Sequence, residues 1–209
     1  MFITFEGPEG SGKTSVANEI CRRLEARGFV VVHTREPGGT PIAEEIRNVI
    51  LDKKNTALDP RAEALLYAAS RRQHLVEKVW PALKRGDIVI CDRFLDSSLA
   101  YQGGARNIGI DKVLDINLFA TENTFPDVTL LFDITPQHGL ERIAKNAKRE
   151  VNRLDLEKLE FHQSVRKTFL ELAKRYANRY VIINAENSYD VVVKDAYQVI
   201  CEKLGITCE

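Results

Sequence analysis

The sequence has no excess charge of either sign, because 30 lysines and arginines balance 30 aspartates and glutamates. Whole-molecule charge therefore gives no reason to expect binding to DNA, RNA or an anionic membrane, and any anion site has to be built locally. Internal repeats, low-complexity segments and domain linkers are also missing. We expect the 209 residues to form one domain spanning 1–209.

Long apolar runs and clustered cysteines are absent as well. No stretch approaches the roughly 18 apolar residues of a membrane span, and the first six residues lack the basic and apolar regions of a secretory signal. The four cysteines, at positions 21, 91, 201 and 208, form no CxxC motif. Their spacing suits a reducing compartment better than a disulfide framework or a zinc site, so we expect a cytoplasmic protein.

Five short β-rich segments alternate with helix-like segments, which is typical of parallel strands joined by crossover helices. Their near-continuous Val, Ile, Leu and Phe content is what strands covered on both faces need. We predict an α/β, doubly wound fold with a five-stranded parallel sheet flanked by helices. The predicted strands are Phe2–Phe5, Phe29–His33, Ile88–Cys91, Val128–Phe132 and Tyr180–Ile183.

Apolar residues at helical spacing predict amphipathic helices between these strands. The first helix contains Val16, Ile20 and Leu24 and ends at Gly28, which can take the left-handed conformation. Asp59-Pro60 supplies an N-cap and a first helical residue for the second. The second helix runs through Leu65, Leu66, Ala69, Leu75 and Val76, and another through Leu159, Val165, Phe169, Leu172 and Tyr176.

A phosphate-binding loop follows the first predicted strand and runs into the first helix. The segment matches G-x-x-x-x-G-K-[ST] with Gly7, Pro8, Glu9, Gly10, Ser11, Gly12, Lys13 and Thr14. Its glycines let backbone N–H groups surround phosphate oxygens, and the helix N-terminus adds positive potential. Lys13 can reach the β- and γ-phosphates of ATP, while the Thr14 hydroxyl can ligate Mg²⁺.

The loop predicts a nucleoside triphosphate site but leaves the reaction open, because motors, GTPases and kinases share it. The N-K-x-D element of guanine-specific switches and the L-S-G-G-Q signature of ABC-type ATPases are both missing. Two alternatives stay open at this point. One is a kinase for another nucleotide, and the other is a module that binds ATP without turnover.

A second polar constellation lies at the end of the third predicted strand. Asp92 and Arg93 stand where open α/β sheets bind ligands, so that Asp92 can hold Mg²⁺ through its water shell and Arg93 can bridge two phosphates. If a helix follows, Ser98, Tyr101 and Gln102 share one face. Tyr67 and Arg71 are likewise one turn apart on the preceding helix.

Together these segments resemble the thymidylate kinase family over nearly the whole chain. The resemblance rests on the phosphate loop, on Thr34–Gly39, on Ala68–Arg72, on Asp92-Arg93-Phe94 and on the lid-like Asn152–Asp155. It implies a P-loop kinase that transfers phosphate from ATP to dTMP with Mg²⁺ as cofactor, and it implies a homodimer. The residue set around Arg71 discriminates against cytidylate, guanylate and deoxynucleoside kinases.

The resemblance also implies individual roles at the dTMP site. Tyr67 would stack on thymine, in place of the commoner Phe, while Arg71, Ser98 and Gln102 would recognise the base. Tyr101 would lie beneath the deoxyribose and disfavour a 2′-hydroxyl. For the rest of dTMP, Glu9 would accept a hydrogen bond from the 3′-hydroxyl, Arg47 would hold the phosphate, and Arg35 and Glu36 would position these groups.

A basic stretch predicts a short helical lid over the triphosphate, at about residues 142–155. Where one branch of the family carries a phosphate-loop arginine, this sequence has Gly10, so the cation has to come from elsewhere. The resemblance implies that the lid supplies it, as in the other branch of the family. The candidates are Arg149 and Arg153, one helical turn apart. We expect Lys13, Arg93, Arg153 and Glu9 to form the catalytic set, since a phosphate acceptor needs orientation and charge neutralisation but no general base.

Overall fold

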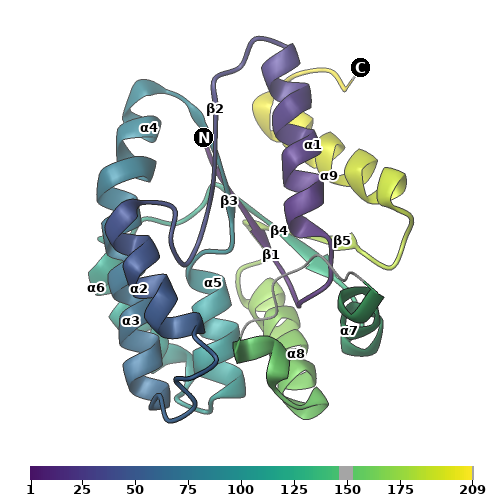
Figure 1. Ribbon diagram of the computed structural model, residues 1–209. Coiled ribbons are helices and arrows are strands. Elements are labelled where there is room, and N and C mark those ends of the chain that lie inside the picture. The colour runs from purple at the N-terminus through teal and green to yellow at the C-terminus, as the bar shows by residue number, and fades with distance from the viewer. Residues whose placement is uncertain (146–152, 209) are drawn as a thin grey trace.

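The computed structural model describes residues 1–145 and 153–208, and within these its centre is a parallel sheet of five strands (Figure 1). The strand order is β2-β3-β1-β4-β5, with helices against both faces. The strands are β1 (Phe2–Glu6), β2 (Val31–Arg35), β3 (Ile88–Asp92), β4 (Val128–Asp133) and β5 (Tyr180–Asn184). The predicted doubly wound α/β fold is confirmed.

The helices alternate with the strands along the chain, as the sequence predicts. They are α1 (Lys13–Ala26), α2 (Pro41–Leu51), α3 (Pro60–His74), α4 (Trp80–Arg85), α5 (Leu95–Ser98), α6 (Ile110–Thr121), α7 (Pro136–Lys145), α8 (Leu159–Arg175) and α9 (Tyr189–Leu204). Two π-helical segments, η1 (Leu75–Val79) and η2 (Leu99–Ala105), and a 3₁₀ turn, η3 (Arg153–Leu156), complete them. The predicted N-cap is present, since the Asp59 carboxylate accepts the N–H groups of Arg61 and Ala62.

The strand predicted over Phe29–His33 lies two residues further along the chain. Phe29 belongs to the cap that follows α1, because its N–H donates to Leu24 O at 3.2 Å in the manner of a Schellman motif. At its other end β2 continues until Arg35 stands opposite Asp92. This shift of β2 brings Arg35 to the carboxyl end of the sheet.

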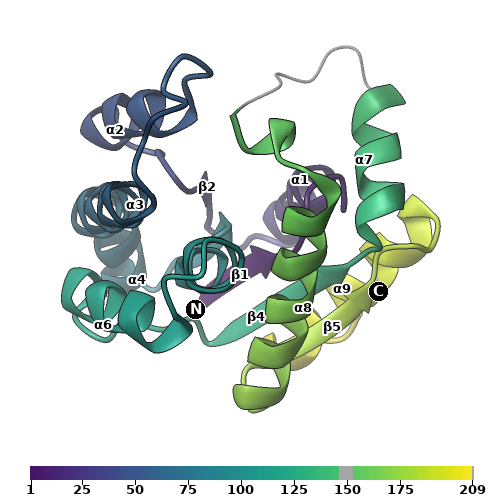
Figure 2. The same ribbon diagram turned by 90° about the horizontal axis from the view of Figure 1, so that it is seen from below.

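Two apolar cores cover the sheet, one on each face. Neighbouring strand residues alternate between them: Ile3 and Ile90 pack toward α1 and α9, whereas Phe2 and Val89 pack toward the core shared by η1, η2 and α8. Burial on both faces explains why the strand sequences are almost continuously apolar. The carboxyl ends of the strands are flanked by α2, α3 and α6 on one side and by α7 and α8 on the other (Figure 2).

Helix α3 turns a face of mixed polarity inward. Glu63 and Arg71 are fully buried on it, whereas Leu65 is 56% exposed. The apolar spacing therefore identified a helix here, but it did not show which of its residues face inward. This face of α3 meets the carboxyl end of the sheet. No described helix combines the length and apolar character that a membrane span requires.

A buried ion pair ties α5 to the segment before β5. Arg179 donates from both terminal nitrogens to the Asp96 carboxylate at 2.7 Å, and one of them also donates to Thr129 Oγ1 at 2.7 Å. Asp96 is fully buried and Arg179 is 7% exposed. Removing one partner leaves the other charge in a site that water does not reach.

We predict that Asp96→Ala lowers the free energy of unfolding by about 3–5 kcal/mol, measured by urea denaturation. The matched control is Asp111→Ala, which breaks the exposed pair between Arg175 and Asp111 and should cost at most about 1 kcal/mol. Equal effects of the two substitutions would contradict the prediction.

Candidate active site

The phosphate loop joins β1 to α1 and folds around the Lys13 ammonium. Lys13 Nζ donates to Gly7 O at 3.0 Å, to Pro8 O at 2.9 Å and to Ser11 Oγ at 3.0 Å. Burial lowers the pKa of Lys13 to about 8, and the nearby Arg93 charge acts in the same direction. An arriving anion would favour the charged form of Lys13 again.

The first turn of α7 rests against the phosphate loop through two glycines. Gly10 has φ 72°, and a Cβ there would overlap the backbone of Gly139; a Cβ on Gly139 would overlap Glu9 O. A side chain at position 10 is therefore excluded while α7 keeps this position. This close approach gives a physical reason why the loop carries no arginine at position 10.

Thr14 and Asp92 meet at the end of β3. The Thr14 hydroxyl donates to Asp92 Oδ2 at 2.5 Å, and both residues line the same cavity as the loop. Hydroxyl and carboxylate oxygens are hard donors of the kind that Mg²⁺ prefers beside phosphates. The donor set at this point fits the predicted metal.

Arg93 stands between the phosphate loop and the helices that follow β3. Its backbone has φ 69°, in the left-handed region that costs a residue with a Cβ about 1–2 kcal/mol. The guanidinium donates to Gly7 O at 3.1 Å, to Ser97 Oγ at 3.1 Å and to Glu9 Oε1 at 3.0 Å. It also lies over the Tyr101 ring, 5.1 Å from the centroid.

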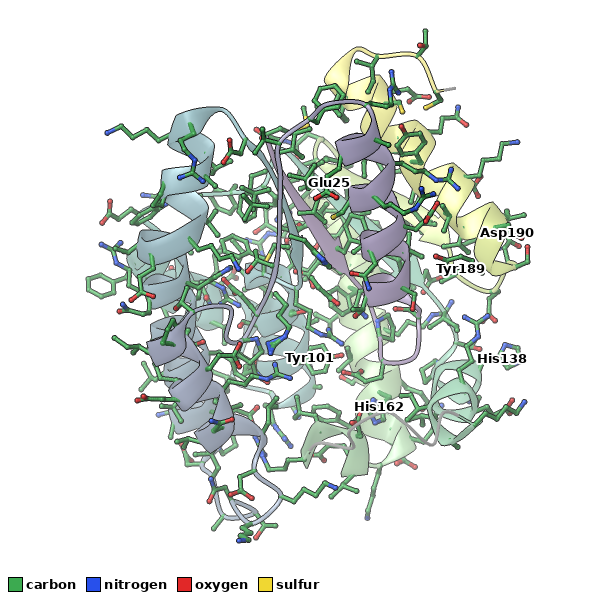
Figure 3. The ribbon with its side chains drawn as sticks, turned by 45° about the horizontal axis from the view of Figure 1, so that its top comes forward. Glu25, Tyr101, His138, His162, Tyr189 and Asp190 are labelled. Carbon is green, nitrogen blue, oxygen red and sulfur yellow. The ribbon has the colours of Figure 1, made fainter. Side chains whose placement is uncertain are left out.

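Side chains from three different segments surround the Glu9 carboxylate. It accepts Arg93 on one oxygen and the Tyr101 hydroxyl on the other, at 2.5 Å, and His162 Nδ1 lies 3.7 Å from that second oxygen. Figure 3 shows Tyr101 on η2 and His162 on α8. Burial opposes ionisation, but Arg93 and these hydrogen bonds hold the pKa of Glu9 well below its usual range.

One cavity of about 600 Å³ joins the phosphate loop to the polar residues beyond β3. Arg142 of α7 also contributes to its wall. The predicted site residues that line it are Glu9, Gly10, Ser11, Gly12, Lys13, Thr14, Arg35, Glu36, Arg47, Tyr67, Asp92, Arg93, Ser98, Tyr101 and Gln102. The structure thus brings the predicted donor and acceptor residues into a single space.

Arg71 lies just behind the wall of this cavity and is 1% exposed. Its Nε donates to Glu36 Oε2 at 2.7 Å, and its terminal nitrogens donate to Ser98 Oγ, Phe94 O and the Asn117 side chain. This network fixes the position of the Ser98 hydroxyl. Arg47, which lines the cavity, donates to Pro37 O at 2.9 Å.

Arg153 is held on the acceptor side of the cavity, away from the phosphate loop. Its guanidinium donates to Ile50 O at 3.0 Å and pairs with the buried Glu63 carboxylate. Glu63 also accepts from Gln102 Nε2 at 2.8 Å, so one carboxylate orients both predicted residues. Arg149, the other predicted lid cation, lies outside the described residues.

Sequence reasoning missed Glu63, Asn117 and His162, which hold Gln102, Arg71 and Glu9 respectively. A signal existed for Glu63, because positions 63, 67 and 71 recur one turn apart and place it on the face of Tyr67 and Arg71. Asn117 and His162 come from α6 and α8, and no spacing in the sequence joins them to the site.

A second group of possible metal ligands, Glu36, His74 and Cys91, lies buried beneath the cavity. Its atoms already have protein partners. His74 bonds Glu36 at 2.9 Å and Thr34 Oγ1 at 2.7 Å, and burial raises the pKa of Cys91 well above its usual range. A metal would have to break these bonds, so the cluster is a hydrogen-bonded support for Glu36.

Comparison with known proteins points to one family. A family model described as thymidylate kinase matches residues 5–196. The chain is 58% identical to a thymidylate kinase of Bacillus velezensis over 204 residues, covering 98% of this chain and 96% of that protein. It is 57% identical to one of Clostridium novyi over 194 residues, covering 93% and 95%.

The fold comparison agrees with the sequence comparison. A crystal structure of thymidylate kinase from Ehrlichia chaffeensis superposes with a TM-score of 0.77 at 34% identity, covering 96% of this chain and 98% of that one. Family model, relatives and fold therefore agree over nearly the full length. The chain belongs to the thymidylate kinase family.

Proposed function

We propose that this protein is an ATP-dependent nucleoside monophosphate kinase that transfers the γ-phosphoryl group of ATP to dTMP, giving ADP and dTDP for dTTP synthesis. One observation carries the proposal: the phosphate loop and the acceptor residues line the same cavity, with Arg93 between them. Membership of the thymidylate kinase family supports the same reaction.

Positioning and charge neutralisation account for the chemistry. The acceptor is a phosphate that is already ionised at neutral pH, so no side chain has to remove a proton. Lys13 and Arg93 are held at fixed positions by loop carbonyls, and fixed cations stabilise developing charge without reorganising. Glu9 keeps the Arg93 guanidinium turned toward the loop.

Mg²⁺ fits beside this pair of cations. Thr14 and Asp92 would hold it, Thr14 directly and Asp92 through water, and both side chains reach the cavity at the loop. When bound, the ion neutralises charge on the β- and γ-phosphates.

The acceptor residues suit a thymine nucleotide. Tyr67 offers a ring for stacking, Arg71 fixes Ser98, and Glu63 fixes Gln102, so the base-facing groups are positioned before dTMP arrives. In this proposal Glu9 accepts a hydrogen bond from the 3′-hydroxyl. Glu36 would act through its pairing with Arg71.

Lid residues of about 142–155 supply the remaining positive charge in this proposal. Arg142 lines the cavity and donates to Ala185 O at 2.9 Å, which places a cation near the phosphate loop. Arg149 and Arg153 remain the proposed ATP-binding lid residues. The pairing of Arg153 with Glu63 would have to open for its guanidinium to reach the triphosphate.

We also propose a cytoplasmic homodimer. The outer faces of α3 and α6 support the dimer, because they expose Phe119 at 90% and Leu65 at 56%. An exposed apolar surface of this kind is typical of an interface between subunits. Charged nucleotides do not cross lipid, so an enzyme acting on ATP and dTMP would work in the cytoplasm.

The reaction is tested with ATP, Mg²⁺ and a panel of dTMP, UMP, CMP, GMP and AMP, following ADP formation. We expect dTMP to be preferred, and Lys13→Ala to lower kcat on the order of 100-fold with an unchanged circular dichroism spectrum. The control is Lys174→Ala, which alters an exposed lysine of α8. Better turnover of CMP or GMP would contradict the substrate, and near-normal turnover by Lys13→Ala would contradict the role of the loop.

Tyr101 is proposed to exclude a 2′-hydroxyl. Tyr101→Leu is smaller but still packs against Phe169, so we expect its activity on ribothymidine monophosphate relative to dTMP to rise about tenfold, or ~1.4 kcal/mol of relative barrier. Tyr101→Phe is the control, because it removes only the hydroxyl that bonds Glu9. An unchanged ratio of kcat/KM values in Tyr101→Leu would refute the steric role.

The dimer is tested by sedimentation. Phe119→Asp places a charge on the proposed interface and should convert the dimer to a monomer, because an unpaired charge is costly to desolvate. Val30→Asp, at an exposed site beyond the end of α1 where the side chain is 65% exposed, should leave the dimer intact. A wild-type protein that sediments as a monomer would contradict the proposed homodimer.

A further inference from the structure

Glu6 is a buried carboxyl that does not line the cavity of the proposed reaction. It is the last residue of β1, directly before the phosphate loop, and is fully buried. One of its oxygens accepts the Phe94 N–H at 2.7 Å and the other accepts the Ser97 hydroxyl at 2.5 Å. Glu6 forms no salt bridge with any described residue. An ion pair therefore does not explain why an acidic residue is buried here.

Both of its partners control Arg93. Phe94 follows Arg93 directly, so its N–H bond to Glu6 fixes the peptide that leaves the left-handed Arg93. Ser97 accepts from the Arg93 guanidinium at 3.1 Å through the same hydroxyl that donates to Glu6. The Glu6 carboxyl group therefore fixes both the backbone turn at Arg93 and, through Ser97, the direction of the Arg93 side chain.

We infer that Glu6 is a positioning residue for phosphoryl transfer, which holds Arg93 in the left-handed turn and aims its guanidinium at the phosphate loop. This inference rests on the proposed function, in which Arg93 touches the transferring phosphate. Glu6 does not touch substrate and acts through Arg93 alone.

The surroundings of Glu6 decide which replacement preserves its role. Burial, reinforced by the negative charge of Asp96, raises the pKa of Glu6 to about 8. The side chain is thus mainly uncharged at pH 7, and glutamine is its closest match in shape and charge. In the uncharged carboxyl the O–H donates to Ser97 Oγ, whereas the ionised carboxylate accepts from the Ser97 hydroxyl. A glutamine can accept the Phe94 N–H through its oxygen and donate to Ser97 Oγ through its amide, as the uncharged carboxyl does.

The experiment compares kcat and KM for dTMP in Glu6→Ala, Glu6→Gln and a control variant that removes a side-chain contact to the opposite end of β1. That control is Asp127→Ala, which removes the acceptor of the Phe2 N–H at 2.7 Å. We expect Glu6→Ala to lower kcat on the order of 100-fold, with a much smaller change in KM, because a misplaced catalytic cation acts mainly in the transition state. Glu6→Gln and Asp127→Ala should both stay within about threefold of the wild-type kcat.

A double-mutant cycle tests whether the effect passes through Arg93. Adding Glu6→Ala to Arg93→Ala should lower kcat further by no more than about threefold, because the group that Glu6 positions is already gone. If Glu6→Ala does not fold, Ser97→Ala takes its place in the cycle, since it removes only the hydroxyl between Glu6 and Arg93.

Several outcomes would overturn the inference while leaving the proposed function intact. They are a near-normal kcat in Glu6→Ala, a Glu6→Gln enzyme as slow as Glu6→Ala, an equal loss in Asp127→Ala, or full additivity with Arg93→Ala. A wild-type protein that does not phosphorylate dTMP would overturn the proposed function and the inference with it.

Discussion

The hydrogen bond from the Arg93 N–H to Phe5 O, at 2.9 Å, joins the ends of β1 and β3, and the site depends on that junction. In a parallel sheet the carboxyl ends of neighbouring strands meet at one edge, where ligands bind. The register pairs Phe5 with Asp92, so the loop that begins at Gly7 and the Asp92-Arg93 pair are brought side by side. Neither segment forms a phosphate site without the other.

Buried carboxylates shape the rest of the cavity wall. Glu36 pairs with Arg71 and Glu63 with Arg153, each at a position that water hardly reaches. Acids at an anion site would repel the ligand unless their charge is matched, and the arginines match it. The same pairs lock the guanidinium groups in place, which gives a polar surface that is organised before substrate binds.

The contact between Gly10 and Gly139 joins the phosphate loop to the start of α7. Because backbone meets backbone there, the start of α7 sits directly on the phosphate loop. A movement of α7 would displace Glu9, because the Glu9 carbonyl is part of the same contact. This packing leaves no room for a side chain at position 10.

Local sequence was sufficient to predict the phosphate loop, the Asp59 cap and all five strands, with β2 displaced by two residues, because each depends on neighbours within a few residues. The sequence also identified most of the residues that line the cavity, through the loop pattern and the family resemblance. Tertiary structure alone decided what holds them. The partners of Arg71 and Arg153 are Glu36, Asn117 and Glu63, from elements whose spacing in the chain reveals no contact.

The inner face of α3 was decided in the same way. The helix packs against a polar cavity, so Glu63, Arg71 and His74 are buried together with the apolar Ala64 and Ala68. Periodicity reports which residues share a face, and it cannot say whether that face meets an apolar core, a polar site or solvent. The sequence by itself therefore determined the elements and the chemistry of the loop, and only the packing of distant elements determined how the charged groups of the site are matched.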